Sequence, residues 1–198
     1  MDKNKIEDAV RLLLEGFGED VNREGLQDTP RRVAGYWEEL LEGMNYTNKE
    51  IALKYGKRFI VNSCPLVVKQ VNNLFSHCEH HLALMYNMTA VIAYIPVEIE
   101  SGKYQVIGLS KIPRIAELCA KRLQLQEKLA DDIAECISMA TGSKDVYVNL
   151  IADHACVSAR GAKNDGITDV TSLKGKFYNN NALRKEVENK AIQFQKRN

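Results

Sequence analysis

The stretch that decides the fold is GLSKIPRIAELCAKRLQLQEKLADDIAECISMATG, residues 108–142. Apolar side chains recur at three- and four-residue spacing through both of its halves, which indicates two amphipathic helices. We expect the first helix to begin after Ser110 and the second to run from about Gln126 to Ala140, with Gly142 as its stop. The apolar positions are Ile112, Ile115, Ala116, Cys119 and Leu123 in the first helix, and Leu129, Ile133 and Ile137 in the second.

Strand patterns flank this helical pair on both sides. Before it, β-branched and alternating segments predict one strand or two within residues 57–75, a strand over 88–99 and a short continuation over 103–110. After it, residues 145–159 alternate again, and 168–178 are expected to form a further strand. The core order of strand, strand, helix, helix, strand, strand predicts an α+β fold, in which an antiparallel sheet has two helices on one face.

Further helices are expected before and after this core. Residues 6–17 have a helical apolar face, and 28–43 form a second helix in which Thr29 caps the first turn and Pro30 takes the first helical position. A polar helix is expected over 182–195. The N-terminal helices therefore precede the sheet as an appendage.

The composition is that of an ordinary globular protein, with 45% hydrophobic and 27% charged residues in a chain of 198. We divide the chain into an N-terminal helical appendage, 1–50, which ends in a loop, and a core domain with the C-terminal helix, 51–198. The net charge is +1, so no basic field favours nucleic acid as a partner.

The expected location follows from what the sequence lacks. No segment approaches the roughly 18 consecutive apolar residues that span a membrane, and the charged start does not have the pattern of a signal peptide. The five cysteines are an odd number and widely spread, which indicates thiols or metal ligands in a reducing compartment. We therefore expect a cytoplasmic protein with no membrane partner.

The metal-capable side chains are concentrated in SHCEHHLALMYNM, residues 76–88. Cys78, His80 and His81 lie within four positions there, although the whole chain has only 4 histidines. Cys78 and His81 have the short spacing at which two side chains of one turn can bind a single ion. The alternative is that these side chains lie on the surface without a further role.

A second cluster of such side chains ends the segment VYVNLIADHAC, residues 146–156. Alternate residues of a strand share a face, so the apolar face that begins at Val146 ends in His154 and Cys156. Taken alone, this pair is best interpreted as a buried thiol beside a core histidine.

Cys156 could also supply a third metal ligand to Cys78 and His81. Three protein ligands leave a fourth position open for water, which is typical of a catalytic zinc site. A structural site would need a fourth ligand, and His80 or His154 is available for it, so the spacing leaves both kinds of site open. Thiolates and imidazole favour zinc over magnesium or calcium.

Cationic side chains follow the predicted strands at two places. Ser110, Lys111 and Arg114 lie at the start of the first core helix, where backbone N–H groups and the helix dipole favour an anion. Arg160 lies four residues beyond Cys156. Ordinary surface charge is the alternative. The chain has neither a Walker-type loop nor a G-x-G-x-x-G fingerprint, so side chains and a helix start would have to bind a phosphate.

Gln126 and Glu127 lie at the start of the second core helix. A glutamate in the first turn of a helix is favoured by the helix dipole. From the residues alone, that is the better interpretation of Glu127, and no further role follows.

Taken together, these segments resemble the GTP cyclohydrolase I family. The resemblance rests on SHCEHHL, AYIP, VIGLSKIPRI, KRLQLQEKLADDI, DHACVSARG and TSLKGKF, with DTPRRVA upstream. Their order and spacing agree from about Asp28 to Phe177, which is most of the chain. The combination of C-E-H-H, G-L-S-K, R-L-Q-x-Q-E and H-x-C-x-x-x-R-G is highly specific.

The resemblance implies a fold and an activity. The fold is the tunnelling (T-) fold, a ββααββ antiparallel sheet preceded by N-terminal helices, so 51–198 would be a catalytic T-fold domain. The activity is the zinc-dependent conversion of GTP and water to 7,8-dihydroneopterin triphosphate and formate, the first step toward folate or tetrahydrobiopterin pterins. The assembly is a toroidal homodecamer with active sites at subunit interfaces.

The resemblance also assigns roles to residues by their place in these motifs. The zinc ligands would be Cys78, His81 and Cys156. The groups that transfer protons would be His80 and His154, with Ser110 near the ribose. Guanine would be bound by Glu127 together with Gln126. The triphosphate would be bound by Lys111, Arg114 and Arg160, and by Arg32 from a neighbouring subunit.

The chemistry implied by the resemblance accounts for these residue types. Zinc lowers the pKa of a bound water toward ~7, which suits hydrolytic attack on C8 of guanine. His154 would protonate N7, because the pKa of histidine lies near neutral pH. His80 and Ser110 would serve the later proton transfers. Glu127 would accept two N–H donors of the guanine edge, and adenine lacks that donor pattern.

The sequence departs from the usual family pattern at three places. Asn87 stands where the family often has a turn glycine, and asparagine can adopt the left-handed conformation needed there. The hairpin PVEIESGKYQVIG, residues 96–108, is longer than usual, and Asp169 stands where the family tends to have serines and threonines. None of these removes an expected ligand. They leave room for altered regulation, or for a paralogue in another GTP-derived pathway such as deazapurine synthesis.

Three rival functions make different demands on the sequence. A zinc nucleobase deaminase needs H-x-E together with P-C-x-x-C, and the chain has no P-C-x-x-C. A related T-fold nitrile reductase would use a nucleophilic cysteine without zinc, against which the Cys/His/Cys set argues. A binding module would keep the fold and the metal but release no formate from GTP.

Overall fold

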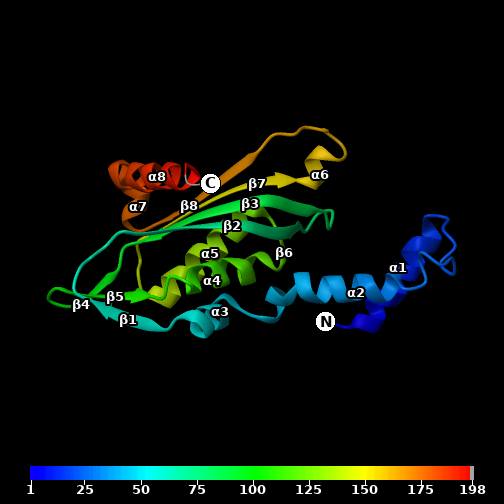
Figure 1. Cartoon of the computed structure of the whole chain (residues 1–198), viewed down its shortest axis with the longest axis horizontal. Helices are drawn as coiled ribbons and strands as arrows, with labels where there is room; N and C mark the ends of the chain where they lie inside the picture. Colours follow the sequence, from blue (N-terminus) through cyan, green and yellow to red (C-terminus); the bar gives the residue numbers. More distant parts are fainter. Residues whose placement is uncertain (197–198) are drawn as a thin grey trace. The chain divides into compact units, whose positions relative to one another are not determined.

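The computed structural model describes residues 1–196, and the chain divides into two compact units, Met1–Glu42 and Gly43–Asn198. The second unit holds the sheets (Figure 1). The first unit consists of α1 (Lys3–Gly16) and α2 (Thr29–Leu40). After α2 the elements are η1 (Glu42–Asn45), α3 (Asn48–Tyr55), β1 (Arg58–Val61), β2 (Val67–Cys78), β3 (Leu84–Tyr94), β4 (Val97–Glu100), β5 (Lys103–Ile107), α4 (Lys111–Ala120), β6 (Leu123–Gln124), α5 (Gln126–Thr141), β7 (Val146–His154), α6 (Ala155–Ser158), β8 (Thr168–Lys174), α7 (Lys176–Asn179) and α8 (Asn181–Gln195).

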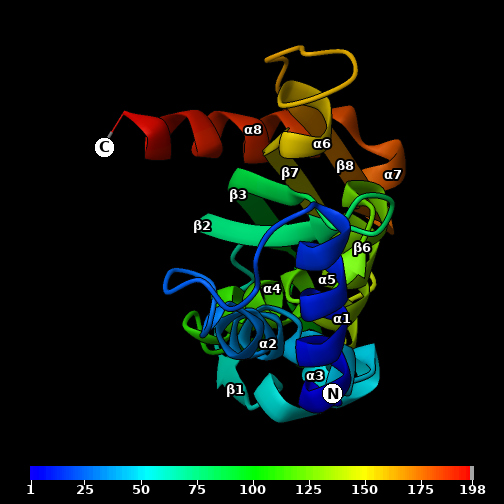
Figure 2. The ribbon, with the colours of Figure 1, turned by 90° about the vertical axis from the view of Figure 1, so that its right-hand side faces the viewer.

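The main sheet has five strands in the order β6-β2-β3-β7-β8. Neighbouring strands run antiparallel, except that the two-residue strand β6 lies parallel to the end of β2. Helices α4 and α5 cover one face (Figure 2). Their apolar side chains pack against those of β2, β3 and β7. The predicted α+β fold, in ββααββ order with both helices on one face, is therefore confirmed.

The spacing of apolar residues explains this layering. In β7, the buried Val148 and Leu150 belong to the cluster beneath α4 and α5, whereas the neighbouring Tyr147 belongs to a second cluster on the opposite face. Such alternation is inherent in a strand. In α5, Ile133 and Ile137 are fully buried at the four-residue spacing of an amphipathic helix.

The opposite face of the sheet is partly covered by α7 and α8 (Figure 2). Phe177 of α7 and Val187 of α8 are fully buried and belong to one cluster with Tyr147 and Val91 of the sheet. The helix that the sequence predicts over 182–195 is therefore a third layer. None of the helices in the described part of the chain combines the length and the apolar composition needed to cross a membrane.

A smaller sheet has its strands in the order β1-β5-β4. Its long hairpin turns at Gly102, whose φ of 75° is a left-handed value that glycine adopts without strain. The segment 57–75, predicted as one strand or two, forms two: β1 belongs to this sheet and β2 to the main one.

Residues 45–50 were expected to be a loop, but 48–50 form the first turn of helix α3. The Thr47 side chain accepts a hydrogen bond from the backbone N–H of Glu50 at 3.3 Å, and the Glu50 carboxylate accepts one from the backbone N–H of Thr47 at 2.7 Å. This reciprocal pair is a capping box. It starts an eight-residue helix that has few apolar residues to reveal its period.

The predicted start of α2 is wrong by one residue, because Asp28, rather than Thr29, is the N-cap and Thr29, rather than Pro30, is the first helical residue. The end of α5 and one strand irregularity agree with the sequence. Gly142 ends α5 in the left-handed conformation, with φ of 79°, as predicted. Asn87 also has a left-handed φ, 49°, so asparagine takes the conformation expected of it.

Candidate metal centre and active site

The turn between β2 and β3 holds one half of the candidate metal centre. Cys78 is the last residue of β2, and its backbone N–H donates to the carbonyl of Ala83 at 2.9 Å. The N–H of Leu82 donates back to the carbonyl of Cys78 at 2.9 Å, and Leu82 has a left-handed φ of 54°. This tight turn places His81, three residues after Cys78, on the same loop of chain.

The pairing of β3 with β7 brings in the other half. Met85 of β3 lies opposite His154, the last residue of β7. Helix α6 begins directly afterwards, and Cys156 is its second residue. The β2–β3 turn, α6 and β6 consequently lie at the same end of the sheet (Figure 1).

Cys78, His81 and Cys156 meet at this point, and their ligand atoms all lie within 4.8 Å of one another. Zinc bonds of about 2.0–2.3 Å would place neighbouring ligand atoms roughly 3.3–3.8 Å apart, so small side-chain movements bring the set onto one ion. The group could therefore hold a metal. Among the residues that the structure describes, this is the one group of three or more potential metal ligands.

The electrostatics of the centre favour the protonated thiol when no ion is bound. Burial raises the pKa of Cys156, and the neighbouring Cys78 thiol raises it further, while the charge of Arg160 lowers it. A metal needs the thiolate, so its binding must displace this proton.

Arg160 also contacts the histidine of the set, because its Nη1 lies 2.7 Å from Nε2 of His81. Arginine only donates hydrogen bonds, so that ring nitrogen accepts. A residue expected to bind triphosphate thus lies beside an expected metal ligand. His80 is exposed in the same turn, with its ring edge-on to that of His81 at 6.3 Å between centroids.

The other expected proton-transfer residue, His154, is half-buried beside the start of α5. Its Nε2 lies 2.7 Å from Oε1 of Gln126, which is 2% exposed. Burial lowers the pKa of His154, while the charges of Glu127 and Asp153 oppose that shift, and the pKa stays below its ordinary value. Glu127 is exposed on the first turn of α5.

The remaining expected residues lie on two other helices. Ser110 is the N-cap of α4 without a side-chain capping bond, Lys111 is its first residue and Arg114 is exposed on its first turn. Arg32 lies on α2, in the N-terminal unit, where its Nη2 is 3.3 Å from a carboxylate oxygen of Asp28.

Sequence reasoning gave no role to Gln124, which the structure places in β6, beside Cys78 at the end of β2. Its side chain is fully buried, and Nε2 donates to Oγ of Ser76 at 3.1 Å and to the carbonyl of Cys119 at 2.8 Å. Ser76 Oγ in turn lies 3.3 Å from the carbonyl of Arg122. The side chain thus joins β2, which ends in Cys78, to the connection between α4 and α5. A glutamine in a two-residue strand has no sequence signature that would reveal this.

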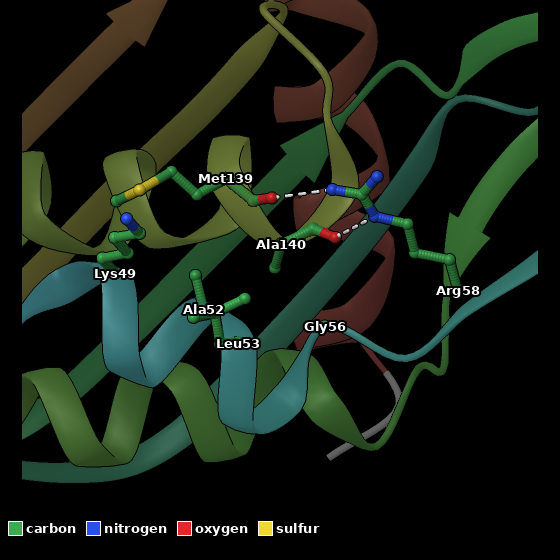
Figure 3. Close-up of a pocket in the computed structure, with 7 residues that line it drawn as sticks. All are labelled: Lys49, Ala52, Leu53, Gly56, Arg58, Met139 and Ala140. Atoms are coloured by element: carbon green, nitrogen blue, oxygen red, sulfur yellow. Dashed lines mark hydrogen bonds between the residues drawn. The ribbon is translucent and has the colours of Figure 1, made fainter.

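A separate hollow of about 490 Å³ lies between α3 and the end of α5 (Figure 3). Arg58 crosses it and donates to the carbonyls of Met139 and Ala140 at 2.9 and 2.8 Å. Lys49 and Ala52 also line it, and none of the seven lining residues is an expected site residue.

The sequence of this chain is similar to those of one known protein family. A sequence model of the GTP cyclohydrolase I family matches residues 6–191. GTP cyclohydrolase 1 of Clostridium beijerinckii is 45% identical over 194 residues, which cover 94% of this chain and 95% of that protein. The same enzyme of Clostridium acetobutylicum is 44% identical over 190 residues, covering 92% and 94%, and that of Clostridium botulinum strain Kyoto is 46% identical over 184 residues, covering 89% and 91%.

Among solved structures, a dihydroneopterin aldolase from Burkholderia thailendensis, bound to guanine, aligns with a TM-score of 0.37 at 15% identity. The alignment covers 57% of this chain and 93% of that one. A likeness at that level says nothing about the activity of this chain.

A ββααββ sheet that gathers two cysteines and a histidine at one end of its central strands defines a class, the T-fold proteins with a candidate metal centre. The match over residues 6–191 and the identity of 45% to a curated member narrow that class. The chain belongs to the GTP cyclohydrolase I family, which is a family of enzymes.

Proposed function

We propose that this chain is a GTP cyclohydrolase I. It opens the imidazole ring of GTP at C8, releases formate and forms 7,8-dihydroneopterin triphosphate. The observation that carries the proposal is the meeting of Cys78, His81 and Cys156 at the end of the sheet where His154 lies.

We propose zinc as the ion of this site, with Cys78, His81 and Cys156 as its ligands. Two thiolates and one imidazole are a soft donor set that suits zinc, and three protein ligands leave a position open. When bound, zinc supplies a water whose pKa is lowered toward ~7 and a positive charge at the reacting carbon.

We assign the proton transfers to His154, His80 and Ser110. His154 exchanges a proton at N7 of guanine, which makes C8 electrophilic and later assists the opening of the ring. His80, exposed in the β2–β3 turn, and Ser110, at the start of α4, serve the rearrangement of the ribose carbons. Both positions can be reached by a substrate, because neither side chain is buried.

We assign substrate binding to side chains of three segments: the first turn of α5, the first turn of α4 and the segment after α6. Glu127 accepts the N–H donors of the guanine edge, and its carboxylate is accessible on the first turn of α5. The triphosphate is bound by Lys111 and Arg114, where the helix dipole of α4 adds to their charge, and by Arg160.

The assembly and location remain proposals from the family and the sequence. We propose a toroidal homodecamer in which Arg32 reaches the triphosphate of a neighbouring subunit, since α2 belongs to a unit separate from the sheet. A cytoplasmic location stays a prediction from the sequence.

Incubation of the purified protein with GTP tests the proposal. We expect equimolar formate and, after mild oxidation, fluorescent neopterin phosphates. GTP that binds without release of formate would instead identify a non-catalytic member of the family. Metal analysis should find about one zinc per subunit. An active protein without a bound metal would show that the assignment of the three metal ligands is wrong.

A further inference from the structure

The side chain of Gln126 faces the protein interior, although the neighbouring Glu127 is exposed. Its Nε2 donates to the carbonyl of Leu150 in β7 at 2.9 Å and to that of Thr168 in β8 at 3.2 Å. Successive residues of a helix point about 100° apart, so one residue of the pair can face the sheet while the other faces outward. The two residues that the sequence expects to bind guanine together therefore face different surroundings.

The orientation of the Gln126 amide is fixed by these bonds. A carbonyl oxygen can only accept, so the side facing Leu150 and Thr168 must be the NH2 group. The reverse orientation would set Oε1 against two carbonyl oxygens. The oxygen of the amide consequently faces Nε2 of His154 at 2.7 Å.

An amide oxygen accepts, so Nε2 of His154 must carry a proton in this contact. In a neutral imidazole one nitrogen donates and the other accepts, and its hydrogen bonds select the tautomer. The other nitrogen, Nδ1, makes no hydrogen bond in the part of the chain that the structure describes. It is the ring atom left available to a substrate.

We propose that Gln126 is a positioning residue that holds His154 as the Nε2–H tautomer and leaves Nδ1 as the atom that exchanges protons with the substrate. The catalytic part of this inference rests on the proposed function. Gln126 acts through His154 and does not bind the guanine. Glu127 alone, among this pair, binds the guanine edge.

The arrangement explains why a fully bonded glutamine lies at this position. Its two donated bonds tie the first residue of α5 to β7 and β8, so the amide cannot turn without losing both. The acceptor offered to His154 is therefore rigid. The outer partners that orient metal-binding histidines typically cost about 10- to 100-fold in metal affinity or activity when they are mutated, and we expect an effect of that order here.

The tautomer can be measured on the wild-type protein. Solid-state 15N spectra of protein labelled only in histidine resolve Nδ1 and Nε2, and the signals absent from a His154→Gln sample assign the residue. At a pH well above the usual histidine pKa of about 6.5, we expect protonated Nε2 and bare Nδ1 for His154. The opposite tautomer would overturn the proposal without any kinetic measurement.

Gln126→Met tests the functional consequence, because methionine keeps the length of the side chain but accepts no comparable hydrogen bond. We expect kcat to fall about 10- to 100-fold with little change in KM for GTP, and a mixture of His154 tautomers in the 15N spectrum. The preference for GTP over ITP, which lacks the 2-amino group, should persist.

Glu127→Gln is the matched control, one residue along the same helix turn. It should raise KM and weaken the preference for GTP over ITP, while the His154 tautomer stays as in the wild type. If Gln126→Met gives that pattern instead, Gln126 binds guanine and the proposal is wrong. If the wild type shows the expected tautomer but turns over no GTP, the proposed function fails while the positioning of His154 stands.

Discussion

Cys78, His81 and Cys156 illustrate how far single residues could be placed from the sequence. The spacing C-x-x-H indicates two ligands on one turn. Cys156 was expected to continue the alternation of a strand over 145–159, but β7 ends at His154 and Cys156 lies in α6. The structure brings the three within 4.8 Å, as the metal hypothesis requires. Gln126 lies three and seven residues before Leu129 and Ile133, so the helical period places it on their inward face, but its hydrogen-bond partners could not be read from that period. Its orientation depends on the carbonyls of β7 and β8, which are distant in sequence.

Cys156→Ala should abolish tight zinc binding, because it removes one of three ligands from a site with no fourth cysteine or histidine in the set. The measurement is metal content per subunit after dialysis against a weak chelator. Cys64→Ala is the control, since Cys64 is exposed and outside the set. Full zinc content in Cys156→Ala would show that the ligand assignment is wrong.

Between elements, the polar contacts of Arg122 join the segment before α3 to α5. Arg122, 11% exposed, has its Nη1 2.9 Å from a carboxylate oxygen of Asp132, 10% exposed, and it also donates to the carbonyls of Gly43 and Tyr46 and to the side chain of Asn48. The order of elements was predictable because strand and helix periods differ. This link was not, because it joins residues more than seventy positions apart.

Asp132→Ala should destabilise the protein by about 3–5 kcal/mol, because it leaves the buried Arg122 without its counter-charge. Burial raises the pKa of Asp132, but hydrogen bonds from Lys128 and Asn48 and the charges of Lys128 and Arg122 lower it overall. Its contribution is therefore complete above the unfolded pKa, near 3.8, and is lost as the pH falls through the lower folded value. Chemical denaturation at a series of pH values between neutral and acid measures this contribution to the free energy of unfolding.

Asp165→Asn, in the exposed segment after α6, provides the comparison for this prediction. It should retain the wild-type acid sensitivity, whereas Asp132→Asn should reduce it. Equal acid sensitivity in the wild type, Asp132→Asn and Asp165→Asn would show that Asp132 does not cause the loss of stability in acid.

The layer formed by α7 and α8 should loosen at alkaline pH because of Tyr147. Burial, with the charges of Glu188 and Asp169, raises the pKa of this tyrosine to about 12. The folded state thus holds the proton more tightly than the unfolded one, so stability is intact below about pH 10 and falls as the pH rises toward 12. Tyr147→Phe should remove that decline in thermal unfolding scans.

Tyr178→Phe is the matched control for this alkaline effect, because Tyr178 is 69% exposed on α7. The stability of Tyr178→Phe should decline with rising pH as that of the wild type does. A Tyr147→Phe protein that loses stability over the same range would show that another group causes the alkaline effect.

The whole molecule consists of a T-fold unit and a separate helical unit that carries Arg32. If the site of one subunit uses Arg32 of its neighbour, two defective variants should complement each other in mixed assemblies. Arg32→Ala and His154→Ala should each have little activity alone. Subunits of both, unfolded together and reassembled, should regain a fraction of wild-type turnover, because some sites receive both residues intact.

The readout for complementation is neopterin fluorescence after mixing, with each variant reassembled alone as the control. The assembly itself should have about ten times the chain mass of 22.3 kDa in sedimentation. Activity in a monomeric fraction, or mixed assemblies no more active than the separate variants, would place Arg32 within its own site or outside it altogether.

We propose that the site formed by Cys78, His81 and Cys156 releases C8 of GTP as formate. The most direct measurement follows 13C from [8-13C]GTP in zinc-loaded wild type and in Cys156→Ala. We expect labelled formate equimolar with dihydroneopterin triphosphate from the wild type, and none above background from the variant. Unchanged [8-13C]GTP with the zinc-loaded wild type, or equal formate from both proteins, would contradict it.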